Sequence, residues 1–228
     1  FEGRGTDAPI ASPAILCGVP HAERLGSSGD VMTYVEYLDG LPAPNGSTCV
    51  VQANANTLRS FLYNRQVEQF LSRAVEEDLF EVYYQPVYSI RKKRFVTLEA
   101  LSRLRHPELG WISPDVFIRL AEKNRLIDAL TDLQLRRVCR FLKSHENVAR
   151  QIDSVKVNLS ALNLMQEHCA ERLIAILDEF ALPHRLFQFE ITETVATEYS
   201  NRLSRAVDAF SQADIGLCLD DFGSGFAN

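Results

Sequence analysis

The sequence predicts an α/β protein whose sheet contains parallel strands. Two observations lead to this class. From about residue 150 onward, short apolar segments alternate with longer segments of helical spacing, a pattern typical of consecutive βαβ units. An acidic or amide residue also closes each apolar segment, as expected where strand ends gather at one edge of a sheet. The sheet is therefore either doubly wound or part of an αβ barrel.

Composition restricts the possible functions. The chain has 228 residues, of which 46% are hydrophobic, so one or two globular domains are expected. The net charge of −6 argues against a nucleic-acid partner. Five cysteines without a C-x-x-C pair disfavour a disulfide framework and fit a cytoplasmic location. The sequence shows neither an apolar run long enough to span a membrane nor a signal peptide, so no membrane contact is expected within this chain.

The first part of the chain is weakly patterned. Residues 1–53 contain strand-like segments at 14–19 and 49–51 and a helical pattern at 31–41, which suggests the tail of an α/β domain. Residues 54–80 carry apolar side chains mostly at i, i+3, i+4 spacing. This spacing predicts one long helix that connects two compact parts.

The remaining elements follow in a regular order. Strands over 81–90 and 95–104 flank a basic turn and predict a hairpin. Ser113 and Pro114 mark a helix start, and Phe117 lies on its apolar face. The later elements are a helix over 131–143, strands over 154–159, 186–191 and 215–219, and intervening helices over 162–180 and 197–212.

Oxygen-bearing residues close four of the predicted strands. They are Glu99, Asn158, Glu190 and Asp220, and Asp221 follows directly. Carboxylates gathered at one sheet edge repel one another unless a cation lies between them. Hard divalent cations such as Mg²⁺ and Mn²⁺ prefer such oxygen ligands. The adjacent aspartates suggest two metal ions that activate water against a phosphodiester.

Other interpretations of single residues stay open. A lone acid at a strand end is usually a helix cap or a solvated loop residue, and Asn158-Leu159-Ser160 could merely cap the following helix. Glu193 is equally suited to starting a helix. Arg103 fits a surface salt bridge as well as a phosphate contact. Trp111 is suited either to packing or to lining a pocket, and Cys218 is expected in the core.

Six short motifs in order resemble the EAL domains, which are bacterial phosphodiesterases of cyclic di-GMP. The resemblance covers about residues 81–228. The motifs are Tyr84-Gln85-Pro86, Glu99-Ala100-Leu101 with Arg103, His106-Pro107-Glu108-Leu109-Gly110, Val157-Asn158-Leu159-Ser160, Glu190-Ile191-Thr192-Glu193 and Asp220-Asp221-Phe222-Gly223.

The resemblance implies a TIM-like (β/α)₈ barrel whose first strand is antiparallel to the rest. It also implies hydrolysis of cyclic di-GMP to linear pGpG by water activated between two Mg²⁺ or Mn²⁺ ions, in a protein that can form a homodimer. The alternative is a receptor or interaction module that binds cyclic di-GMP without cleaving it.

The resemblance further assigns roles to individual residues. Glu99, Asn158, Glu190 and Asp220 correspond to ligands of one metal, and Asp220 and Asp221 to ligands of the other. Arg103 corresponds to a phosphate contact, Gln85 and Leu101 line the nucleotide pocket, and Glu193 steadies the loop after the strand that carries Glu190. Glu99, Glu193 and Asp221 form the catalytic group.

The resemblance also defines expected domains and departures. Residues 1–53 resemble the tail of a GGDEF-like domain, 54–80 form the connecting helix, and 81–228 are the N-terminal portion of the EAL domain. The family pattern continues beyond Asn228 with further site residues, so the barrel is incomplete and the chain alone is expected to be inactive. A fragment of a longer protein is favoured over a truncated molecule. Where the family has a helix-ending glycine, Arg125 stands here, and Asn124 is expected to supply the left-handed turn.

Overall fold

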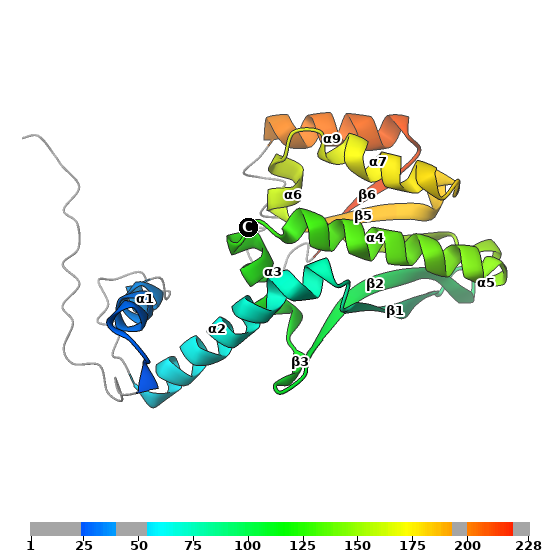
Figure 1. Ribbon diagram of the computed structural model, residues 1–228. Coiled ribbons are helices and arrows are strands. Elements are labelled where there is room, and N and C mark those ends of the chain that lie inside the picture. Colours follow the sequence, from blue (N-terminus) through cyan, green and yellow to red (C-terminus); the bar gives the residue numbers. More distant parts are fainter. Residues whose placement is uncertain (1–23, 40–53, 193–199, 221–228) are drawn as a thin grey trace, which may run out of the picture. The chain divides into compact units, whose positions relative to one another are not determined.

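A computed structural model describes residues 24–39, 54–192 and 200–220. The chain divides into two compact units, residues 1–66 and 67–228. The division falls inside helix α2 (Ala55–Glu76), which occupies most of the segment where the spacing predicts a long helix. Figure 1 shows the helices and strands of both units.

The first unit contains α1 (Ser28–Asp39) and the N-terminal part of α2. Tyr34 is fully buried, and its hydroxyl lies 2.7 Å from Thr57 Oγ1. Arg65 forms an ion pair with Asp30. The small core of this unit comprises Leu25, Tyr34, Leu38, Leu58 and Phe61. The strands expected at 14–19 and 49–51 lie outside the described residues.

The second unit is built on a mixed sheet in the order β1-β2-β4-β5-β6. β1 pairs antiparallel with β2, whereas the β2–β4, β4–β5 and β5–β6 pairs are parallel. This confirms the α/β class and the antiparallel first strand. The sheet of the described strands is open. The strands are β1 (Phe80–Ser89), β2 (Arg94–His106), β3 (Gly110–Ile112), β4 (Ser154–Asn158), β5 (Phe187–Thr192) and β6 (Gly216–Asp220).

Helices cover one face of this sheet, and Figure 1 shows α4, α7 and α9 along that side. The helix α4 packs on α7, and α7 packs on α9. None of the helices in the described ranges is long and apolar enough to cross a bilayer. The helices are α3 (Pro114–Lys123), α4 (Ile127–Ser144), α5 (Glu146–Gln151), α6 (Ala161–Met165), α7 (Cys169–Glu179) and α9 (Ser200–Gln212), with a short 3₁₀ turn at His184–Leu186.

Alternation along the strands separates the core from a polar face. Val155 and Val157 of β4 and Phe187 and Phe189 of β5 are fully buried beneath the helices. Because successive strand residues point to opposite faces, the residues between them face away from this core. Phe189 packs against Phe210 of α9, with ring centroids 4.9 Å apart. The core therefore fixes which strand residues are left for a site.

Two buried thiols belong to this core. Burial raises the pKa of Cys139 to about 12 and that of Cys169 to about 11. Both side chains therefore stay protonated and poorly nucleophilic near neutral pH.

The predicted single helix over 162–180 is wrong, because two helices occupy this segment. Ser160 caps α6 by accepting from the backbone N–H of Leu162, and α6 ends at Met165. His168 then adopts a left-handed conformation, with φ of 65°, before α7 begins. Apolar spacing continues across the break, so periodicity alone did not reveal it. The short β3 and α5 were also not predicted.

The left-handed residue after α3 is Arg125, with φ of 58°, and not Asn124 as expected. The Asn124 amide is engaged elsewhere, since its Nδ2 donates to the Leu120 carbonyl and to Glu68 Oε1. Arg125 thus occupies the family's glycine position despite the strain that a side chain adds there, about 1–2 kcal/mol.

Removing the Phe189 side chain tests the packing between β5 and α9. We expect Phe189→Ala to lower the free energy of unfolding by about 3–5 kcal/mol, because it leaves a cavity in a fully buried site. Urea denaturation measures the change. Ile90, which is 86% exposed, provides the control, and Ile90→Ala should change stability by less than about 0.5 kcal/mol. Equal effects of the two substitutions would contradict this packing.

Candidate functional site

Three of the predicted metal ligands lie on neighbouring strands, on the face opposite the helices. In the parallel register, Glu99 of β2 lies opposite Lys156 of β4, and Asn158 of β4 lies opposite Glu190 of β5. Residues in register on adjacent strands share a face of the sheet. The structure therefore brings the Glu99, Asn158 and Glu190 positions together.

Glu190 is the buried member of this group, with 4% of its surface exposed. Lys156 Nζ donates a hydrogen bond to Glu190 Oε1 at 2.5 Å. Cys218 of β6 donates to the same oxygen, with Sγ 3.6 Å away. Cys218 is only partly buried, and its thiol contacts Glu190. The prediction that Cys218 lies in the core is therefore wrong.

Lys156 is the site residue that the sequence analysis missed. Its hydrogen bond to the Glu190 carboxylate raises the pKa of its ammonium, and the charges of Glu190 and Glu99 act in the same direction. Lys156 therefore carries a positive charge near neutral pH. The available signal was a single lysine inside the apolar strand sequence Ser-Val-Lys-Val-Asn, at the spacing that places it on the same face as Asn158.

The donor chemistry of this face fits a hard divalent cation. Glu99 and Glu190 provide carboxylate oxygens and Asn158 an amide oxygen, the ligand types that Mg²⁺ and Mn²⁺ prefer. The ammonium of Lys156 on Glu190 shows that the carboxylate already attracts a cation. Within the described ranges, no three His, Cys, Asp or Glu side chains form a ready metal cluster.

The remaining acidic positions are only partly described. The backbone of Asp220 lies opposite Thr192, at the end of β6. Asp221 and Glu193 lie outside the described residues. Their roles at the site remain predictions.

The predicted nucleotide contacts share the face of Glu99. Gln85 of β1 lies opposite Glu99, and Leu101 lies opposite Tyr83. The Arg103 guanidinium carbon lies 5.7 Å from the Tyr83 ring centroid, and Nη1 donates to the Ser102 carbonyl at 3.0 Å. In the part of the chain that the structure describes, Arg103 is in none of the ion pairs, so the surface salt bridge is not observed.

A hollow of about 540 Å³ lies beside Arg103. Trp111, which is 51% exposed, lines this hollow and also contacts the edge of Tyr83, with ring centroids 5.9 Å apart. Trp111 therefore serves both of the roles considered for it. The other lining residues are Tyr83, Arg103, Ile112, Ser113 and Pro114.

Helix α4 holds the backbone next to the candidate ligands. Gln134 is buried, and its Nε2 donates to the carbonyl of Ala100 at 2.7 Å, directly after Glu99. Beyond β4, Ser160 is the N-cap of α6. The Asn158-Leu159-Ser160 segment therefore does cap the following helix, as the alternative expected, but through Ser160 and not through Asn158.

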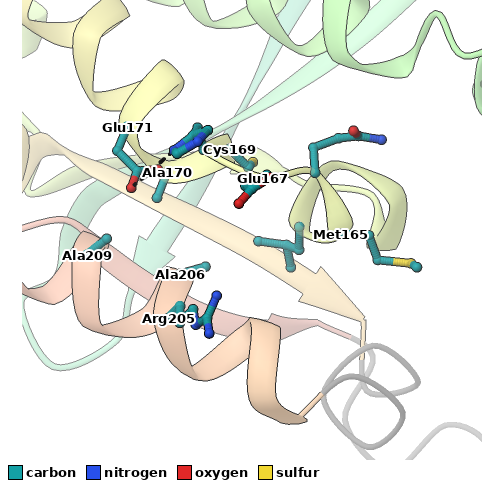
Figure 2. Close-up of a pocket in the computed structure, with 11 residues that line it drawn as sticks. Met165, Glu167, Cys169, Ala170, Glu171, Arg205, Ala206 and Ala209 are labelled. Carbon is teal, nitrogen blue, oxygen red and sulfur yellow. Dashed lines mark ion pairs between the residues drawn. The ribbon is translucent and has the colours of Figure 1, made fainter.

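A second pocket, of about 300 Å³, lies on the helical side between α6, α7 and α9 (Figure 2). Its lining includes Met165, Cys169, Glu171 and Arg205. Glu171 Oε1 lies 4.0 Å from His168 Nδ1 at its rim. None of the predicted site residues within the described ranges lines this pocket.

Comparisons with known proteins agree with this arrangement. Residues 68–228 match the family model described as EAL domain. The chain is 33% identical over 163 residues to the cyclic di-GMP phosphodiesterase NbdA of Pseudomonas aeruginosa, covering 72% of this chain and 21% of NbdA. It is 31% identical over 160 residues to the cyclic di-GMP phosphodiesterase PA2567 of the same species, covering 69% of this chain and 27% of that protein.

Solved structures show the same fold. A MucR phosphodiesterase in complex with cyclic di-GMP superposes with a TM-score of 0.66 at 27% identity, covering 72% of this chain and 66% of that one. The FimX EAL domain from Pseudomonas aeruginosa, bound to cyclic di-GMP, gives a TM-score of 0.63 at 24% identity, covering 70% and 64%. These likenesses confirm the TIM-like architecture predicted from the sequence.

Replacing Gln134 tests the support behind Glu99. We expect Gln134→Leu to lower the free energy of unfolding by about 1–3 kcal/mol, because the buried carbonyl of Ala100 loses its donor. Urea denaturation is the measurement. Gln69→Leu at an exposed position of α2 is the matched control, with an expected change within about 0.5 kcal/mol. A Gln134→Leu protein as stable as this control would show that the hydrogen bond contributes nothing.

Proposed function

Because this chain belongs to the EAL domain family, we propose that it is part of a metal-dependent phosphodiesterase that hydrolyses cyclic di-GMP to linear pGpG. The carboxylate and amide positions that neighbour one another on β2, β4 and β5 carry this proposal. The relatives named as cyclic di-GMP phosphodiesterases support the substrate. The chain spans about a fifth of NbdA, so the activity concerns the whole protein that contains it.

Glu99, Asn158, Glu190 and Asp220 would hold one Mg²⁺ or Mn²⁺ ion, and Asp220 and Asp221 would hold a second. When bound, such ions supply activation of a water molecule and neutralisation of phosphodiester charge. Glu99 and Glu190 lie on the face of the sheet opposite the apolar core. Neighbouring carboxylates on such a face favour a cation between them.

The remaining residues would bind and orient the nucleotide. Arg103 can donate two parallel hydrogen bonds to a phosphate, and its guanidinium is held over Tyr83 at the edge of the hollow. Gln85 and Leu101 extend the same face toward Glu99. Aromatic surfaces such as Tyr83 provide stacking area for a purine base. Glu193 would steady the segment after β5.

A second candidate is a receptor that binds cyclic di-GMP without cleaving it. One observation favours it: the ammonium of Lys156 forms an ion pair with the buried carboxylate of Glu190. In a receptor, the site would need no further cation, and the nucleotide would bind through Arg103 and the hollow alone. Both candidate functions are compatible with the further proposals that the protein is cytoplasmic and forms a homodimer.

Turnover of cyclic di-GMP tests the proposal. The full-length protein with Mn²⁺ should produce pGpG, and Glu99→Ala should reduce the rate by more than about 100-fold through loss of a metal ligand. Chromatographic separation of substrate and product gives the rate. Glu146→Ala is the control, because Glu146 pairs only with Arg150 on exposed α5 in the described part of the chain and should leave the rate unchanged.

The possible outcomes separate the two candidates. Loss of turnover in Glu99→Ala but not in Glu146→Ala would support the phosphodiesterase. Saturable cyclic di-GMP binding without product from the wild-type protein would favour the receptor. Turnover that survives in Glu99→Ala at the wild-type rate would contradict the role of Glu99.

A further inference from the structure

Lys156 occupies a position with no role in the proposed reaction. Its strand neighbours Val155 and Val157 are fully buried in the core, whereas Lys156 points to the polar face. There it lies in register with Glu99 on one side and is hydrogen-bonded to Glu190 on the other. A single ammonium group thus lies between two of the proposed metal ligands.

The contacts of Glu190 show what this ammonium does. Both described hydrogen bonds to the carboxylate, from Lys156 and from Cys218, go to Oε1. A buried carboxylate needs such partners, since its charge is otherwise strongly destabilised away from water. Lys156 therefore balances the Glu190 charge from within the protein.

We propose that Lys156 is a tethered counter-cation that competes with the divalent cation for Glu190 and thereby lowers the metal affinity of this site. The inference rests on the proposed metal site. For Glu190 to become a metal ligand, Oε1 must exchange the ammonium for the metal. After the exchange, the displaced ammonium remains near the metal and repels it, because it is tethered to the same strand as Asn158.

A purely structural ion pair makes the opposite prediction. If Lys156 only held β4 and β5 together, its removal would loosen the ligands and weaken metal binding. If it competes, its removal frees Glu190 and strengthens metal binding. The direction of the change in affinity therefore distinguishes the two roles.

The test measures the affinity of the full-length protein for Mn²⁺ in the absence of nucleotide. Electron paramagnetic resonance of free Mn²⁺ gives this affinity for the wild-type protein and for each variant. Lys156→Met keeps much of the side-chain volume but removes the charge. We expect it to bind Mn²⁺ about tenfold more tightly than the wild-type protein, a change of about 1.4 kcal/mol. Lys156→Arg retains the charge and should stay close to the wild-type affinity.

Lys92→Met is the matched control for net charge. Lys92 pairs with Asp153 at 2.7 Å, at the opposite end of β4 from Asn158. The Lys92→Met substitution removes the same positive charge from an ion pair beside the same sheet, but away from the candidate metal site. Its Mn²⁺ affinity should equal that of the wild-type protein.

Each outcome decides the inference. Tighter binding in Lys156→Met alone supports it. Unchanged or weaker binding in Lys156→Met, while the wild-type protein binds Mn²⁺, overturns it and leaves the phosphodiesterase proposal intact. Equal tightening in Lys92→Met also overturns it, because the effect would then reflect net charge. If no variant binds Mn²⁺, both this inference and the metal-dependent function fail.

Discussion

A carboxylate buried beside a hydrophobic core is the constraint on which the site depends. Glu190 is nearly inaccessible to water, so its negative charge must be matched from within the protein or by a ligand. Lys156 and Cys218 supply that match from the two neighbouring strands. The same demand that makes Glu190 suitable for binding a metal cation also makes it bind the ammonium of Lys156.

The sheet creates this situation through simple alternation. Phe187 and Phe189 pack under the helices, which forces Gln188 and Glu190 onto the opposite face. The parallel register then places Asn158 beside Glu190 and Lys156 beside Glu99. Core packing and site geometry thus follow from one strand arrangement. A register shift of one residue would turn the core side chains of a strand to the polar face and its site side chains to the core.

Much of this arrangement could be predicted from the sequence. The places of Asn158 and Glu190 on successive strands were recognisable because apolar segments of defined length precede them. Glu99 was wrongly expected to end its strand: it lies in the middle of β2, which continues to His106 because it also pairs with β1 and β3. Spacing could not predict Lys156, since its importance arises from a hydrogen bond to a residue 34 positions away. The left-handed conformation of Arg125 was also not predictable, since the neighbouring Asn124 side chain is held by the Leu120 carbonyl and Glu68. The left-handed His168 between α6 and α7 was likewise not visible in the apolar spacing. Tertiary contacts, rather than propensity, decided these positions.

The most direct measurement of the central claim is anomalous diffraction at the manganese absorption edge, from crystals of the full-length protein grown with Mn²⁺. We expect an anomalous peak bonded to the side chains of Glu99, Asn158, Glu190 and Asp220, with the Lys156 ammonium displaced from Glu190. A structure without manganese at these residues, in which Lys156 still holds Glu190, would contradict the claim that this face of the sheet is a metal centre.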